Sequence, residues 1–311
     1  MRLEDNLRQI FWQNSSVRKE ALTVIEQCLE QLPFGFRCSS TLFVLEKSYT
    51  EAPNLHIDTA RKLIEIMAMI STRSGRPDFF SVVEVVTVLL GIFSQHGIAQ
   101  FGSAVESMFL RFSHSLQLLP ALSESCMRNY SRETLNMFLP NENEILLSAG
   151  KALCLKAMMR TFVWQYGSQT EIENVWHCVR ITIETRRIET IHASLAQRII
   201  SVGFVGVVHP LNNAELGAML KAIACPLNNA VNASDVGFCK ALCALITSIL
   251  SHQSVINYIR TLISTDFDYI VRTYFTLRST LNRCNFNASR VFLDAVVQAK
   301  VALDAIFWPT S

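Results

Sequence analysis

Cysteine and histidine are the residue types in this chain most able to hold a metal ion or act as nucleophiles. The closest cysteine pair is Cys239 and Cys243, which lie one helical turn apart in an apolar segment. A structural zinc site needs four ligands at set spacings, and the sequence has no CxxC or HxxxH pair to complete one. His177 and Cys178 are adjacent, but neighbours on a helix point about 100° apart and cannot act on one reacting atom. The sequence therefore predicts buried thiols and no metal site.

The motifs of common enzymes are missing from the sequence. It contains no GxxxxGK[ST] or GxGxxG phosphate-binding loop, no GxSxG nucleophile turn and no HExxH metal motif. The seven histidines are isolated from one another. Glu171, Glu173 and Glu184 fall on the polar face of one predicted helix, where solvated charges are expected and not a general acid/base pair. We therefore expect a protein that is not an enzyme and carries no cofactor.

Arginine side chains are the next candidates, because basic residues contact the phosphates of nucleic acids. Arg272, Arg278, Arg283 and Arg290 fall near one predicted helical ridge, together with Tyr274. Acidic residues stand beside them, and the formal net charge is only +2, whereas a nucleic-acid surface is normally of one sign. The pattern favours a solvated helix surface and leaves nucleic-acid binding through these arginines as an alternative.

Aromatic residues at the two ends of the chain are the best candidates for binding a partner protein. Leu7, Phe11 and Trp12 lie on or beside the apolar face of the first predicted helix, and Phe307 and Trp308 close the last one. Tryptophan and tyrosine are enriched among the residues that dominate the binding energy of protein interfaces. The same side chains could instead hold the terminal helices against the core, and the sequence leaves both interpretations open.

Composition indicates a folded chain with a large apolar interior. Of its 311 residues, 50% are hydrophobic and 17% are charged, against about 25% charged in an ordinary soluble domain. The first residues are too polar for a signal peptide. Glu84 interrupts the most apolar run, 79–93, which is shorter than the roughly 20 residues that span a bilayer. We expect an intracellular protein, cytoplasmic or nuclear, with unpaired thiols and no membrane segment.

The elements that position these residues follow the periodicity of the α-helix. Apolar residues recur every three to four positions, with polar capping residues at the starts and proline or glycine at the ends. Ser168 with Glu171 forms a capping-box signature, Ser234 is expected to cap another helix, and Pro226 is expected to end the helix that begins at Asn212. The valines of segment 79–94 favour a strand, but its length and the lack of a partner strand favour a helix. The sequence predicts an all-α fold.

The predicted helices form pairs at a regular spacing. First helices begin at intervals of about 40 to 46 residues, near Ser16, Asp58, Ser103, Asn143, Ile188 and Ser234. This rhythm resembles that of armadillo/HEAT-like α-solenoids, in which stacked helix pairs bury one another's apolar faces. The resemblance implies one continuous helical domain over 1–311, with a capping or docking helix at 1–15. A compact multi-helix globular domain is the alternative.

These expectations together predict a non-enzymatic scaffold or adaptor subunit of an intracellular complex. Its helical-repeat surface would bind peptides or helices of one or more partner proteins, because a low charged fraction leaves more apolar surface for contacts. The alternative is a nuclear chromosome-associated factor, belonging to a DNA maintenance or recombination complex, that contacts nucleic acid through the basic ridges.

Overall fold

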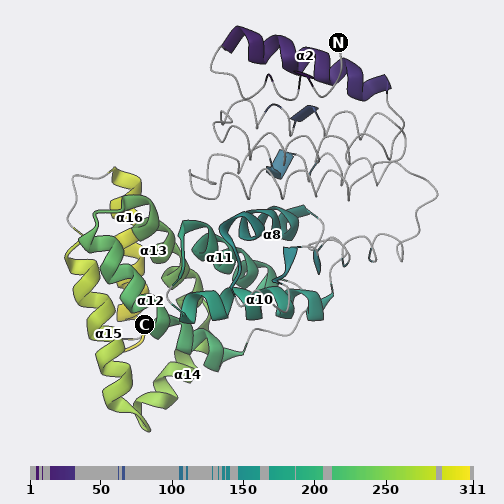
Figure 1. Cartoon of the computed structure of the whole chain (residues 1–311). Coiled ribbons are helices and arrows are strands. Elements are labelled where there is room, and N and C mark those ends of the chain that lie inside the picture. Colours follow the sequence, from purple (N-terminus) through teal and green to yellow (C-terminus); the bar gives the residue numbers. More distant parts are fainter. Residues whose placement is uncertain are drawn as a thin grey trace. The chain divides into compact units, whose positions relative to one another are not determined.

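The structure is a computed structural model. It describes residues 15–31, 146–161, 168–185, 187–205, 212–284 and 289–308, together with scattered positions between 5 and 140. Within these residues there are nine α-helices and no strand (Figure 1). They are α2 (Ser15–Gln31), α8 (Ala149–Thr161), α10 (Gln169–Glu184), α11 (Thr190–Val205), α12 (Asn213–Asn232), α13 (Val236–Leu250), α14 (Gln253–Ile263), α15 (Phe267–Asn282) and α16 (Arg290–Asp304). The prediction of an all-α fold is confirmed for this part of the chain.

The chain divides into two compact units. The first consists of Met1–Phe138 and Ser148–Gly167 and contains α2 and α8. The second, which we call the C-terminal unit, consists of Leu139–Leu147 and Ser168–Ser311 and contains α10 to α16. One continuous stack of helix pairs over 1–311 stays a prediction. The predicted helix at 79–94, and all of 1–15 but a few positions, lie outside the described residues.

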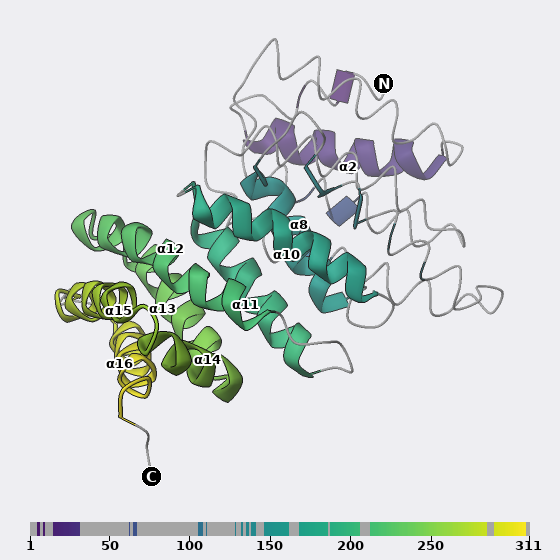
Figure 2. The same cartoon turned by 90° about the horizontal axis from the view of Figure 1, so that it is seen from below.

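Helix α13 lies at the centre of the C-terminal unit. It packs against α11, α12, α14 and α16 (Figure 1; Figure 2). Its sequence explains this position, because apolar residues occupy nearly every side of the helix. Seven of its residues are buried: Cys239, Leu242, Cys243, Leu245, Ile246, Ile249 and Leu250. Neighbouring helices therefore bury their inner faces against α13 and turn their outer faces away from it.

Two predicted helix boundaries in this unit are wrong. Asp235, and not Ser234, caps α13, because the Asp235 carboxylate accepts the N–H of Phe238 at 2.9 Å. Ser234 precedes it in the left-handed region, with φ 56°. Pro226 does not end a helix, since α12 continues through it to Asn232. Proline removes one backbone hydrogen bond, but Pro226 and the apolar residues after it are buried, and this packing outweighs the loss.

The capping box predicted at the start of α10 is confirmed. The Ser168 hydroxyl accepts the backbone N–H of Glu171 at 3.4 Å, and a Glu171 carboxylate oxygen accepts the backbone N–H of Ser168 at 2.9 Å. This exchange satisfies two backbone donors that have no partner inside the helix. Glu171 is consequently buried, contrary to the expectation of a solvated side chain, whereas Glu173 and Glu184 are exposed as predicted.

A buried histidine holds the segment before residue 148 against α10 and α11. His192 Nε2 lies 2.8 Å from the carbonyl oxygen of Leu147, and the Leu147 N–H donates to the Thr182 hydroxyl at 3.1 Å. The Glu189 N–H donates to His192 Nδ1 at 3.0 Å. A backbone N–H can only donate, so Nδ1 accepts, Nε2 carries the hydrogen and the ring is neutral. Burial lowers the pKa of His192, against smaller opposing effects of the Leu147 carbonyl and the Glu189 charge.

The seven described cysteines are all free thiols: Cys28, Cys154, Cys178, Cys225, Cys239, Cys243 and Cys284. Four of them, at 154, 239, 243 and 284, are buried among apolar side chains. Burial raises the pKa of the Cys154 thiol, which keeps it protonated and unreactive. These thiols act as small apolar side chains of the core.

We predict that the melting temperature of the chain is the same with and without a reducing agent. Unpaired thiols add no cross-link to the unfolded chain, so their reduction has nothing to remove. Thermal unfolding followed by circular dichroism, with and without a phosphine reductant, measures this directly. A lower melting temperature in the reductant would contradict the prediction and would place a stabilising disulfide in the chain.

We also predict that the free energy of unfolding falls as the pH drops below about 6.5, the ordinary pKa of histidine. The unfolded chain takes up a proton at His192 there, while the folded chain resists it until a lower pH, so unfolding is favoured in that window. Urea unfolding between pH 7.5 and 5 would measure the decline. His192→Gln, whose amide can accept and donate as the ring does, should flatten it.

His252→Gln supplies the matched control, because His252 is half-buried at the start of α14 and burial lowers its pKa too. This variant should keep most of the pH dependence of the wild type. If both variants flatten the pH dependence equally, the fall in the free energy of unfolding does not come specifically from His192.

Candidate functional site

The two aromatic residues at the C-terminal end that are predicted to bind a partner lie in different environments. Phe307 is half-buried, and its ring packs edge-on against Tyr274 of α15, with the ring centroids 4.5 Å apart. Trp308 is 65% exposed, with its ring 5.9 Å from that of Phe307. Phe307 therefore holds the end of the chain against α15, and Trp308 is the residue of the pair presented at the surface.

The other predicted partner-binding residues, Leu7, Phe11 and Trp12, lie outside the described residues. Their role in docking a partner stays a prediction.

The C-terminal end of α16 is fixed by an arginine from another helix. Arg260 of α14 donates from Nε to the carbonyl oxygen of Ile306 at 2.9 Å and from Nη2 to that of Ala305 at 2.7 Å. The last carbonyls of a helix have no partner inside it, and hydrogen bonds from a charged donor are stronger than neutral ones. Arg260 thus sets the direction in which the chain leaves α16.

A second polar contact ties α15 to α16. Arg278 donates to both carboxylate oxygens of Asp304 at 3.0 Å, and the Tyr274 hydroxyl donates to Asp304 Oδ1 at 2.7 Å. Burial alone would raise the pKa of Asp304, but the hydrogen bonds from Tyr274 and Arg278 outweigh it and hold this pKa below its ordinary value. The carboxylate is therefore charged at neutral pH and keeps both partners.

Because Arg278 pairs with Asp304, one of the four arginines of the predicted basic ridge already has a partner. Arg272 and Arg278 are six residues apart, which places them about 120° apart around α15. Arg272 is exposed and pairs with Asp268 at 3.2 Å. Arg283, at the end of α15, donates to Asn228 and Asn232 of α12, and Arg290 is exposed at the start of α16. The structure does not bring the four side chains onto one face of α15, and nucleic-acid binding through them stays a prediction.

Exposed apolar side chains gather on α15 and α16. Seven of the nine large exposed ones in the described part of the chain are Phe267, Phe275, Val291, Leu293, Val297, Val301 and Trp308. Leu293, Val297 and Val301 follow one another at intervals of four residues and so form a row along α16, which we call the α16 stripe. They are 40%, 56% and 58% exposed, while Phe292, Val296, Ala299 and Leu303 of the same helix are buried.

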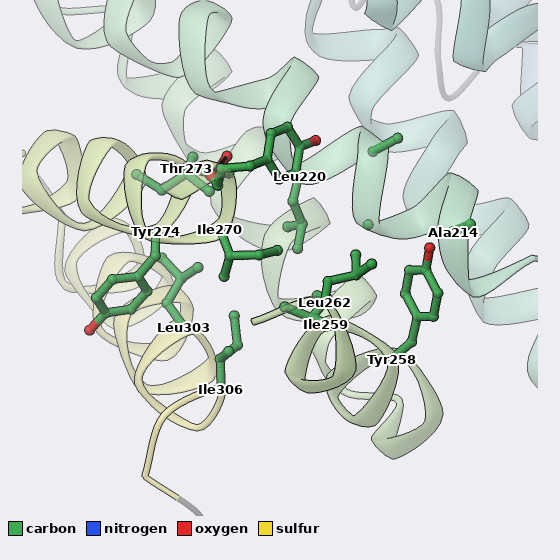
Figure 3. A pocket seen from close by; sticks show the side chains of 14 residues that line it. Ala214, Leu220, Tyr258, Ile259, Leu262, Ile270, Thr273, Tyr274, Leu303 and Ile306 are labelled. Carbon is green, nitrogen blue, oxygen red and sulfur yellow. Dashed lines mark hydrogen bonds between the residues drawn. The ribbon is translucent and has the colours of Figure 1, made fainter. Parts of the chain in front are cut away.

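A cavity of about 220 Å³ lies between α12, α14, α15 and the end of α16 (Figure 3). Its lining is almost wholly apolar, with three tyrosines and one threonine. The fourteen residues are Ala214, Gly217, Ala218, Leu220, Tyr258, Ile259, Leu262, Tyr269, Ile270, Thr273, Tyr274, Leu277, Leu303 and Ile306. None of them is acidic or basic, so the lining offers no carboxylate or imidazole for acid/base chemistry.

The residues considered for metal binding or catalysis remain scattered in the part of the chain that the structure describes. No group of three or more histidine, cysteine, aspartate or glutamate side chains there is placed to hold a metal ion. His177 is exposed on α10, and its Nδ1 lies 3.4 Å from Arg180. Cys239 and Cys243 share the buried side of α13 with Cys284 nearby.

Sequence reasoning missed both the α16 stripe and the cavity. The apolar row of the last predicted helix is Phe292, Ala295, Val296, Ala299, Leu303 and Ile306, and all of these except the half-buried Ala295 are buried. Leu293, Val297 and Val301 are apolar but fall outside that row, and this is the signal that could have found the stripe. The cavity has no comparable signal, because its lining comes from four helices that are distant in sequence.

Among the described residues, no single helix is both long enough and apolar enough to span a membrane. Helices α13 and α14 reach that length and composition only as a pair, and they are bent by 84° at the break between them.

The comparisons with known proteins add no functional assignment to this geometry. The sequence matches no protein-family model, and no curated protein matches it.

Proposed function

We propose that this chain is a non-enzymatic scaffold or adaptor subunit of an intracellular complex, and that the α16 stripe binds an amphipathic helix of a partner protein. The observation that carries this proposal is the row of three apolar side chains exposed along the last helix of the C-terminal unit. Contiguous apolar surface of this kind marks interaction sites on folded proteins.

The spacing of the stripe favours a helix as the occupant. Side chains at intervals of four residues form a ridge, and such ridges pack into the grooves of a second helix. Leu293, Val297 and Val301 form this ridge, and Arg290 and Asp294 lie beside it. An apolar centre with a polar edge is the usual anatomy of a protein interface.

The contacts behind the stripe favour a surface that is already formed before binding. Helix α16 packs along α13 on its inner face. Arg260 fixes its C-terminal end, and Arg278 ties Asp304 to α15. A partner therefore does not have to order this helix, and the entropic cost of binding is lower.

We predict that Val297→Asp combined with Val301→Asp weakens partner binding by at least about 100-fold, because two carboxylates would be buried without partners in the interface. The melting temperature should stay close to that of the wild type, since both side chains are more than half exposed. The matched control is Gln298→Asp, which adds a charge to an exposed position of the same helix.

The measurement is affinity purification of the tagged full chain from its own cells, with the companions of wild type and variants identified and quantified side by side. Companions that are lost from the double variant and kept by Gln298→Asp support the proposal. The same companions in all three preparations overturn it. A melting temperature of the double variant as low as that of Leu245→Asp, which charges the centre of α13, also overturns it, because Val297 and Val301 would then be core residues.

A further inference from the structure

The cavity between α12, α14, α15 and α16 is a feature that the proposed function does not use. Its volume of about 220 Å³ exceeds that of the roughly 150 Å³ apolar cavity that binds benzene in another protein. Its walls are formed by closely packed side chains, since Leu220, Ile259, Leu277 and Leu303 are at most 4% exposed. Ile270 and Ile306 lie around the same space in Figure 3. The cavity therefore offers a preformed place for an apolar group larger than a benzene ring.

Two hydroxyl groups of the lining are available to a ligand. Neither Tyr258 nor Tyr269 has a hydrogen-bond partner for its hydroxyl among the described residues, whereas the Tyr274 hydroxyl is held by Asp304. In Figure 3 the Tyr258 hydroxyl lies on the Ala214 side of the cavity. Burial, with the charges of Asp266 and Tyr258, raises the pKa of Tyr269. Both phenols are donors at neutral pH.

A cation lies next to one of these tyrosines. The Lys221 ammonium is 4.3 Å from the centroid of the Tyr269 ring. Lys221 is exposed, directly follows Leu220 of the lining, and forms no ion pair with any residue that the structure describes. Asp266, the residue just before α15, accepts the backbone N–H of Tyr269 at 3.2 Å and caps the helix. The positive end of α15 therefore offsets the charge of Asp266.

We infer that the cavity binds a small amphiphilic carboxylate, with its apolar chain inside and its carboxylate held by Lys221 and the hydroxyls of Tyr258 and Tyr269. The cavity is about half again as large as the one that admits the six carbons of benzene, so a chain of about seven carbons fits inside it. An ammonium and two phenol donors match the acceptor oxygens of a carboxylate.

A peptide fits the same cavity less well. The lining backbone belongs to helices, apart from Ile306 just beyond α16, whose carbonyl already accepts Arg260. A peptide inserted there would leave its own backbone N–H and C=O groups without partners, at a cost in free energy that a hydrocarbon chain does not incur.

The experiment is a calorimetric titration of the full chain with hexanoate, heptanoate, octanoate and decanoate, and with octan-1-ol as the uncharged probe. We expect the affinity to rise about fourfold with each methylene up to octanoate, whose chain fills the cavity, and to rise no further with decanoate. An affinity that does not depend on chain length, or no binding of any of these probes, overturns the inference.

Two variants separate the apolar and charged parts of the site. Gly217→Leu fills the cavity and should abolish binding of octanoate and octan-1-ol alike. Lys221→Gln should weaken octanoate about tenfold by removing a charged hydrogen bond, and leave octan-1-ol unchanged. Gly217→Ala is the steric control, because a Cβ at this position meets the Tyr258 ring at an ordinary 3.6 Å. Octanoate binding that survives Gly217→Leu, or that Lys221→Gln does not weaken, overturns the assignment.

This inference is independent of the α16 stripe. The Val297→Asp, Val301→Asp double variant should bind octanoate as the wild type does, so either proposal can fail without the other. A short peptide with an apolar C-terminal residue is the remaining probe. If it displaces octanoate and binds more tightly than any of the fatty acids, the cavity is a peptide site and the inference is wrong.

Discussion

The burial of α13 is the constraint on which the C-terminal unit depends. An apolar helix of this kind must be covered on nearly every side, because each exposed core side chain would cost about 1.5 to 3 kcal/mol. Four helices, α11, α12, α14 and α16, supply that cover. Each of them commits one face to α13, and the surfaces left over are those on which a partner or ligand can act. The α16 stripe is such a surface, since its residues lie on the side of α16 turned away from the buried Phe292 and Val296.

Apolar packing does not determine where each helix ends or how the chain leaves it. Polar contacts determine both. Arg260 binds the carbonyls of Ala305 and Ile306 just beyond α16, and Arg278 with Tyr274 binds Asp304, the last residue of that helix. Both arginines are only partly exposed, and the Arg278 pair is bidentate, which distinguishes it from surface ion pairs of little energetic weight. The exposed Trp308 and the wall of the cavity at Leu303 and Ile306 both depend on this fixed helix end.

The sequence predicts the helices of this unit well, because their apolar periodicity is set by the core that they share. It predicts the capping box of Ser168 and Glu171 for the same reason, since that motif is complete within four residues. It fails where a distant contact decides the outcome. Pro226 remains inside α12 because burial outweighs its missing hydrogen bond, and Arg278 turns to an aspartate 26 residues away. The cavity could not be predicted at all, since it exists only where four helices meet.

Gly217 shows how the cavity relates to the stability of the fold. A glycine inside a helix costs roughly 0.5 to 1 kcal/mol relative to alanine, and the added Cβ of an alanine would make only ordinary contacts with Tyr258 and Ile259. The fold therefore has no steric need for glycine at this position, and a larger apolar residue would fill space that is now empty. The small residues at 214, 217 and 218 of α12 leave space unfilled between this helix and α14. The free protein thus lacks packing at the cavity and leaves the apolar side chains of the α16 stripe exposed. A ligand bound in the cavity and a partner bound on the stripe would each bury the apolar surface that is exposed there.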